Sequence, residues 1–97
     1  MSGFTISKHA EKRMRQRGIK NADLLSIYAH ADQIFPVGSG CNAIRFSKKM
    51  KKKQEKSKLI SNFQKLKNMV LIIDDFDLVV TVFIDYGGKH GRRYRNA

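Results

Sequence analysis

The chain has 97 residues, of which 41% are hydrophobic and 29% are charged. This is the length of one domain, and the composition is too apolar for a wholly disordered chain. Lys and Arg outnumber Asp and Glu by 20 to 8, which gives a formal net charge of +12 at pH 7. A charge of this size attracts nucleic acids, anionic membrane surfaces and acidic proteins, and it does not dictate a fold.

Residue content excludes several kinds of site. Cys41 is the only cysteine, so the chain cannot form an intramolecular disulfide or a cysteine-based zinc site. His9, His30 and His90 are too widely spaced to indicate a metal site, and no phosphate-binding glycine loop is present. The N-terminus lacks the apolar stretch of a secretory signal, and the longest apolar runs are too short to span a bilayer. We therefore expect a cytoplasmic protein without a cofactor or a bound metal.

The opening of the chain predicts a short strand followed by a helix. The residues just before Ser7 alternate between apolar and polar, and Ser7 is a favourable helix N-cap. Residues 8–17 contain neither Gly nor Pro, and Gly18 follows where a helix C-cap is expected. Ala10 and Met14, which are four residues apart, would form the buried face of this helix.

A second helix is predicted to take Asn21 as its N-cap and to run over residues 22–31. Its broad apolar stripe at helical spacing consists of Leu24, Leu25, Ile27, Tyr28 and Ala31. Two extended segments, 33–37 and 41–46, then flank a glycine-rich turn, and Pro36 indicates an edge strand.

The second half of the chain predicts one more helix and a hairpin. We expect a single helix over residues 48–67, with its lysine-rich first half mostly in solvent. Residues 68–73 and 78–85 are β-branched and apolar on either side of an acidic turn, as in a β-hairpin. A basic tail follows at residues 86–97, and its order is left open by the sequence.

The element order is therefore β-α-α-β-β-α-β-β, or the same order with the two middle strands merged. We expect a single α+β domain over residues 1–97, in which two N-terminal helices pack on a small antiparallel sheet. A basic third helix would be inserted before the C-terminal hairpin.

The positive charge is concentrated in one segment. Residues 48–67 carry nine basic residues and one acidic residue, a net +8, whereas residues 1–47 carry +4 and residues 68–97 carry zero. Like charges four residues apart destabilise a helix, so the run suggests a polyanionic partner. The alternative is a solvated helix face. The expected nucleic-acid-binding residues are Lys48, Lys49, Lys51, Lys52, Lys53, Lys56 and Lys58 of this helix and Arg92, Arg93 and Arg95 of the tail.

Candidate catalytic chemistry lies on the first helix, where His9, Arg13 and Arg17 are spaced four residues apart and share one face. An imidazole can transfer protons near neutral pH, and guanidinium groups stabilise negative charge that develops on a phosphate. The alternative is that His9 is an ordinary surface histidine and that the arginines pair with nearby acids such as Glu11 or Asp23.

Other polar residues are weaker candidates. Thr81 lies in the middle of the last strand, on the face expected to carry Val79 and Phe83, and either a catalytic or a purely strand-forming role is open. Asp85 could act as a carboxylate base, although nothing in the sequence distinguishes it.

The segment Ser7-Lys8-His9-Ala10-x-x-Arg13-Met14-x-x-Arg17-Gly18-Ile19 resembles the opening of the bacterial domain-of-unknown-function 4258 family. The strand Val79-Val80-Thr81-Val82 and the tail that follows it resemble the end of that family. The resemblance covers nearly the whole chain, and it implies similarity to BrnT- and RelE-type toxins. Those toxins are small basic α+β proteins that cleave RNA without metal and are neutralised by an antitoxin. By this resemblance the catalytic positions are His9, Arg13, Arg17 and Thr81.

We therefore expect a toxin-like, metal-independent endoribonuclease of the mRNA-interferase type, in which a 2′-hydroxyl attacks the adjacent phosphate. RNA, free or on the ribosome, would be the substrate, and an acidic antitoxin would be a further partner. Two alternatives stay open. One is an RNA- or DNA-binding protein of the same fold without catalysis. The other is a protein-interaction module that binds an acidic partner.

Overall fold

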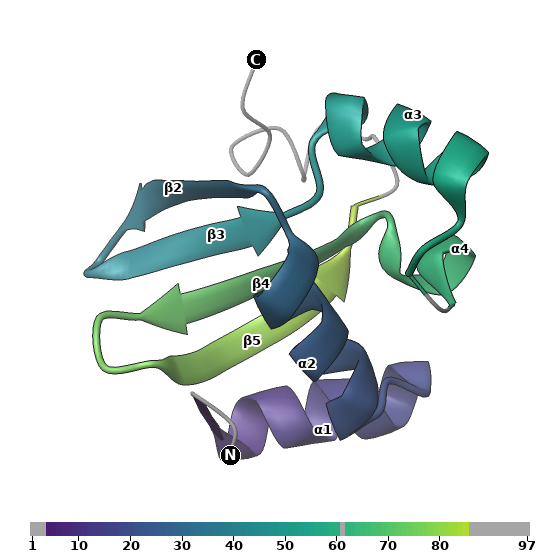
Figure 1. Ribbon diagram of the computed structural model, residues 1–97. Helices are drawn as coiled ribbons and strands as arrows, with labels where there is room; N and C mark the ends of the chain where they lie inside the picture. The colour runs from purple at the N-terminus through teal and green to yellow at the C-terminus, as the bar shows by residue number, and fades with distance from the viewer. Residues whose placement is uncertain (1–3, 61, 86–97) are drawn as a thin grey trace.

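The computed structural model describes residues 4–60 and 62–85, which form helices and strands around one mixed sheet (Figure 1). The fold is α+β, as expected. In chain order the elements are β1 (Thr5–Ile6), α1 (Lys8–Arg17), α2 (Asn21–His30), β2 (Gln33–Gly38), β3 (Cys41–Arg45), α3 (Lys48–Ser57), α4 (Phe63–Leu66), β4 (Met69–Asp74) and β5 (Leu78–Ile84).

The five strands are arranged in the order β1-β5-β4-β3-β2. The pairs β2–β3, β3–β4 and β4–β5 are antiparallel, and β2, which contains Pro36, is an edge strand as expected. The short β1 instead pairs in parallel with β5, with Thr5 opposite Leu78. The expectation of a wholly antiparallel sheet is therefore wrong. Local sequence patterns indicate hairpins between successive strands, whereas the pairing of β1 with β5 joins the two ends of the described chain.

The two faces of the sheet are covered differently. α1 and α2 lie against one face (Figure 1), and the main core there includes Ala10, Leu24, Ile27, Leu71 and Val82, each with no solvent exposure. On the opposite face a smaller cluster is formed by side chains of the strands themselves: Phe35, Val37, Cys41, Ala43, Val70, Ile72, Val80 and Phe83. No helix among residues 4–60 and 62–85 is long and apolar enough to cross a membrane.

The first helix forms as its sequence predicts. The Oγ of Ser7 accepts a hydrogen bond from the Ala10 N–H at 3.0 Å, which satisfies one of the free donors at the helix start. Gly18 ends the helix in the left-handed conformation, with φ of 67°. The second helix begins one residue earlier than expected, since Lys20 rather than Asn21 is its N-cap. The carboxylate of Asp23, three residues later, accepts the Lys20 N–H at 2.9 Å and supports that start.

The expected single helix over 48–67 is wrong, because the structure divides it into α3 and α4. Lys58 and Asn62 both take the left-handed conformation, with φ of 53° and 58°, and the chain changes direction between them. The buried side chain of Gln54 accepts the Ile60 N–H at 3.0 Å and stabilises this break. As a result Phe63 turns into the core against Phe46, with ring centroids 4.9 Å apart, while all α3 lysines except the partly buried Lys51 stay exposed. One straight helix could not satisfy both requirements.

The last strand contains a β-bulge that the sequence pattern does not reveal. Ile72 pairs with Thr81 but Ile73 pairs with Val79, so Val80 is an extra residue in β5. Val79 therefore faces the helices and belongs to the main core, whereas Thr81 lies on the opposite face with Ile72 and Phe83. The expectation that Thr81 shares a face with Val79 is wrong, because strict alternation is interrupted at the bulge.

Candidate functional site

The exposed side of α1 carries the arrangement that the sequence singles out. His9, Arg13 and Arg17 are all exposed, and each is separated from the next by about 6 Å along the helix axis. Within residues 4–60 and 62–85 their side chains make no hydrogen bond and no ion pair. In particular, Asp23 pairs with Lys65 and not with an arginine of α1. The three groups thus share one exposed side of α1, with no partner in the described part of the chain.

The other residues of the same segment hold α1 in place. Ser7 Oγ donates to the carbonyl oxygen of Val80 at 2.9 Å, so one hydroxyl both caps the helix and binds the bulge of β5. Ala10 and Met14 are buried against the sheet, and Ile19 is buried just after the helix. A helix anchored at its start and along its inner side presents its outer side chains from a fixed support.

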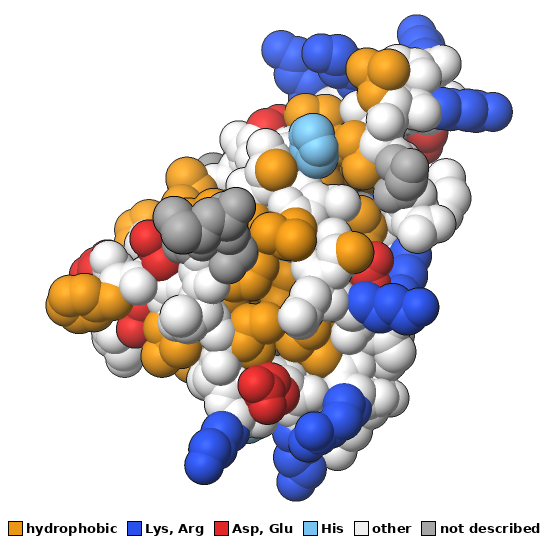
Figure 2. Space-filling model, turned by 60° about the horizontal axis from the view of Figure 1, so that its bottom comes forward, with side chains coloured by type: hydrophobic (Ala, Val, Ile, Leu, Met, Phe, Trp, Pro, Cys, Tyr) orange, Lys and Arg blue, Asp and Glu red, His pale blue; other side chains and the backbone are white. Residues whose placement is uncertain are grey.

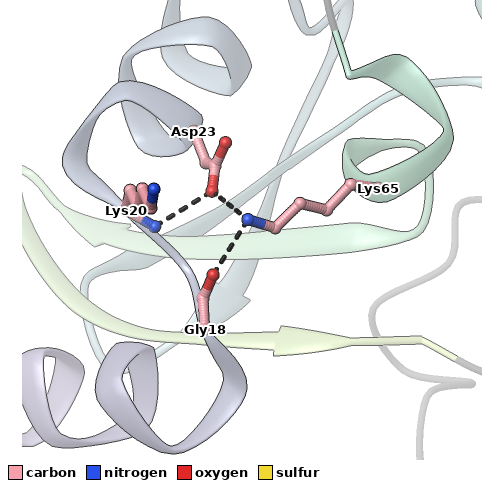
Figure 3. A network of polar contacts seen from close by, with 4 residues as sticks. All are labelled: Gly18, Lys20, Asp23 and Lys65. Atoms are coloured by element: carbon pink, nitrogen blue, oxygen red, sulfur yellow. Dashed lines mark hydrogen bonds and ion pairs between the residues drawn. The ribbon is translucent and has the colours of Figure 1, made fainter.

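The junction between α1 and α2 is fixed by a polar network (Figure 3). Lys65 of α4 donates to the carbonyl oxygen of Gly18 and to the carboxylate of Asp23, both at 2.8 Å. Burial disfavours the charged form of Asp23, but the hydrogen bonds from the Lys20 backbone and from Lys65 outweigh it and lower the pKa of this carboxyl group. Lys65 therefore has a structural role, which the sequence did not indicate.

The lysines of α3 form a second cationic surface. The helix is capped by Ser47, whose backbone N–H and hydroxyl are both held by the carboxylate of Asp32. Only Lys51 among the expected phosphate-binding lysines is partly buried, and it donates to Asn68 Oδ1 at 3.1 Å. The exposed ones are Lys48, Lys49, Lys52, Lys53, Lys56 and Lys58.

The two cationic surfaces frame the helical side of the molecule. Figure 2 shows Lys and Arg side chains along the lower edge and at the upper end of this side, with a largely hydrophobic area between them. α1 itself contributes Lys8, Lys12, Arg13, Arg15 and Arg17 against a single acid, Glu11. A flexible polyanion is the kind of ligand that can follow such separated patches.

Thr81 is not part of this arrangement. It is half-buried and lies on the sheet face opposite the one that α1 covers, so the sheet separates it from His9. The tail residues Arg92, Arg93 and Arg95 lie outside the described residues. In the part of the chain that the structure describes, no three His, Cys, Asp or Glu side chains gather as metal ligands would.

A buried ion pair was not indicated by the sequence. Arg45, at the end of β3, donates to the carboxylate of Asp85 at 3.0 Å, and the two side chains are 6% and 2% exposed. In the sequence, this pair is marked only by a basic residue within one alternating strand and an acidic residue at the end of another. They are 40 residues apart in the chain, so their pairing follows from the sheet order alone.

Comparison with known protein families gives a match over most of the chain. The family model described as "Domain of unknown function (DUF4258)" matches residues 6–84, a span that runs from β1 to the end of β5. The chain belongs to the DUF4258 family. A search of curated proteins and a search of solved structures give no match. The DUF4258 match includes α1 with its exposed histidine and arginines, the helix α3 and the bulged strand.

Proposed function

We propose that this DUF4258 protein binds single-stranded RNA and cleaves it at the exposed face of α1. The observation that carries the proposal is the set of His9, Arg13 and Arg17, which have no partner among residues 4–60 and 62–85 and lie on a helix whose inner side is anchored to the sheet. Exposed arginines without acidic partners suit a phosphodiester, because each guanidinium offers several donors in a fixed plane.

The reaction is an intramolecular transfer within the RNA. His9 accepts the proton of a ribose 2′-hydroxyl as the 2′-oxygen attacks the adjacent phosphorus. A new P–O2′ bond forms, the P–O5′ bond breaks, and water supplies a proton to the departing 5′-oxygen. The products are a 2′,3′-cyclic phosphate and a 5′-hydroxyl. Arg13 stabilises the charge on the phosphate oxygens, and Arg17 holds the next phosphate along the strand.

Similarity to BrnT- and RelE-type toxins is part of this proposal. Small size, strong positive charge and two N-terminal helices on one sheet face support it. An acidic antitoxin that covers α1 would then neutralise the protein by occupying the same cations. The lysines of α3 hold RNA that flanks the cleaved bond.

The test is incubation of the purified protein with a labelled single-stranded RNA in the presence of a chelator. The wild type is expected to give a 2′,3′-cyclic phosphate end. His9→Ala is expected to slow cleavage by about 10²-fold or more while changing RNA affinity little. Arg13→Gln should slow it strongly as well. Lys12→Gln is the matched control, because it removes one exposed charge from the neighbouring position of the same helix.

Two outcomes would contradict the cleavage proposal. One is intact RNA with the wild type under all conditions, and the other is equal rates for the Arg13→Gln and Lys12→Gln proteins. The exposed α3 lysines favour the second candidate function, RNA binding without cleavage. In that case affinity would fall steeply with salt while the RNA stays whole.

A further inference from the structure

A polar cluster lies where β3 and β5 end and β4 begins, away from the exposed face of α1. Hydrogen bonds between described residues there join α3, the end of β3, the residue before β4 and the residue after β5. Arg45 binds Asp85 at 3.0 Å, the Asp85 N–H donates to the Asn68 carbonyl at 2.8 Å, and Lys51 of α3 donates to the Asn68 side chain at 3.1 Å. Neither the cleavage step nor the exposed lysine surface uses this cluster.

The surroundings of Lys51 are unusual for a lysine. Partial burial is the largest influence on its pKa and lowers it, and the nearby guanidinium of Arg45 lowers it further. Lys67 and Lys48 act in the same direction, and the carboxylate of Asp85 opposes them. That carboxylate is already paired with Arg45. The ammonium group of Lys51 thus stands among cations, with the neutral amide of Asn68 as its hydrogen-bond partner.

Within the described residues the cluster around Lys51 therefore holds more cations than anions, and an anionic ligand would offset this excess. A lysine needed only to anchor α3 could make the same hydrogen bond to Asn68 without three further cations beside it. A tetrahedral anion would accept hydrogen bonds from Lys51, whose ammonium has three donors, and would lie in the field of Lys67 and Lys48. The buried Arg45–Asp85 pair would then act as a positioning pair that fixes the end of β3 beside Lys51.

We propose that this cluster binds a phosphate group, with Lys51 as the direct ligand. The inference rests on the proposed function for the source of the phosphate, the RNA backbone, whereas a free phosphate would use the same chemistry. Because burial and, after it, the neighbouring cations lower the pKa of Lys51, we expect phosphate affinity to be lost as the pH rises through a value below the ordinary lysine range. Among residues 4–60 and 62–85, the groups that face Lys51 are Arg45 from β3, Asp85 after β5, Lys67 and Asn68 before β4, and Lys48 on α3 itself.

The experiment separates binding from cleavage by using 2′-O-methyl RNA, which has no attacking hydroxyl. Lys51→Met keeps the apolar stem and removes the charge, whereas Lys51→Arg keeps the charge and does not titrate in this range. Lys52→Met removes an exposed lysine that we assign to flanking RNA, so it is the control for the loss of one surface charge: it should lower RNA affinity but keep the pH dependence and the phosphate effect. Affinity is measured by fluorescence anisotropy as a function of salt and between about pH 7 and pH 10.

For Lys51→Met we expect affinity to fall about three- to tenfold and the salt slope to become shallower by about 0.7 to 1. The wild type and the Lys52→Met protein should lose affinity across this pH range, while Lys51→Arg should not. Inorganic phosphate, compared with chloride at equal ionic strength, should raise the melting temperature of the wild type but not of Lys51→Met.

Each result bears on the proposal. A phosphate-induced shift that needs Lys51, with unchanged RNA affinity, supports the site and assigns it to a free phosphate. Unchanged RNA affinity together with no phosphate effect overturns the site. If Lys51→Met does not fold, loss of the pH dependence in Lys51→Arg decides the matter alone. Failure of RNA cleavage by the wild type would refute the proposed catalysis without affecting any of these readouts.

Discussion

The hydroxyl of Ser7 connects two parts of the fold that are 73 residues apart, and its removal is a quantitative test of how α1 is anchored. In Ser7→Ala the Ala10 N–H loses its cap, which costs about 1 kcal/mol. The Val80 carbonyl also loses its donor in a partly buried position, which costs about 1 kcal/mol more. We therefore expect the free energy of unfolding to fall by about 2 kcal/mol, or the melting temperature by about 10 °C.

The assay is urea unfolding followed by far-UV circular dichroism. Ser57→Ala is the matched control, since this exposed serine donates only to the Lys53 carbonyl near the end of α3, and we expect a loss below about 0.5 kcal/mol. Ser7→Thr retains a hydroxyl and should restore most of the stability. Equal stability of the Ser7→Ala and Ser57→Ala proteins would refute the double role of Ser7.

Three further predictions concern the backbone and the α1–α2 junction. Gly18→Ala should cost about 1 kcal/mol in urea unfolding, because φ is 67° and no atom within 4 Å of the new methyl group compensates. Lys58→Gly should stabilise the protein by about 1 kcal/mol, because glycine adopts the left-handed conformation at the end of α3 without the steric strain of a side chain. An unchanged urea midpoint would contradict this. Asp23→Asn should cost about 1–2 kcal/mol at pH 7 in the same assay. The pKa of Asp23 is lowered in the folded state, so its contribution to stability is fully present above the ordinary carboxyl pKa of about 4. This contribution is lost as the pH falls through the lower folded-state pKa. The wild type and the Asp23→Asn protein should therefore become equally stable in acid.

The elements that sequence analysis predicted correctly are those governed by short-range interactions. α1 was located from its cap residues Ser7 and Gly18, whose hydrogen bonds reach only a few residues along the chain. The hairpin of β4 and β5 followed from two apolar runs around an acidic turn. In each case the pattern and the interaction that produces it lie within the same short segment.

The errors have long-range causes. The division of α3 from α4 accompanies the burial of Phe63 against Phe46. The parallel pairing of β1 with β5 joins segments that lie at opposite ends of the described chain. The bulge at Val80 changes which face Thr81 occupies, and this moved a candidate catalytic residue away from the others. A repeating pattern in the sequence does not show where a partner strand lacks one residue.

The same distinction between short-range and long-range causes applies to the candidate site. The sequence by itself determined that the chain is strongly cationic and that His9, Arg13 and Arg17 share one face of a helix, since helical geometry fixes the spacing of side chains four residues apart. Only the tertiary structure decided which charged groups are already paired. Asp23 meets Lys65 across 42 residues, and Asp85 meets Arg45 across 40. Such pairs form because the packing of the sheet and helices brings distant segments together. The cations of α1 that have no partner among the described residues, and the cluster around Lys51, could therefore be distinguished from structural charges only in the folded chain.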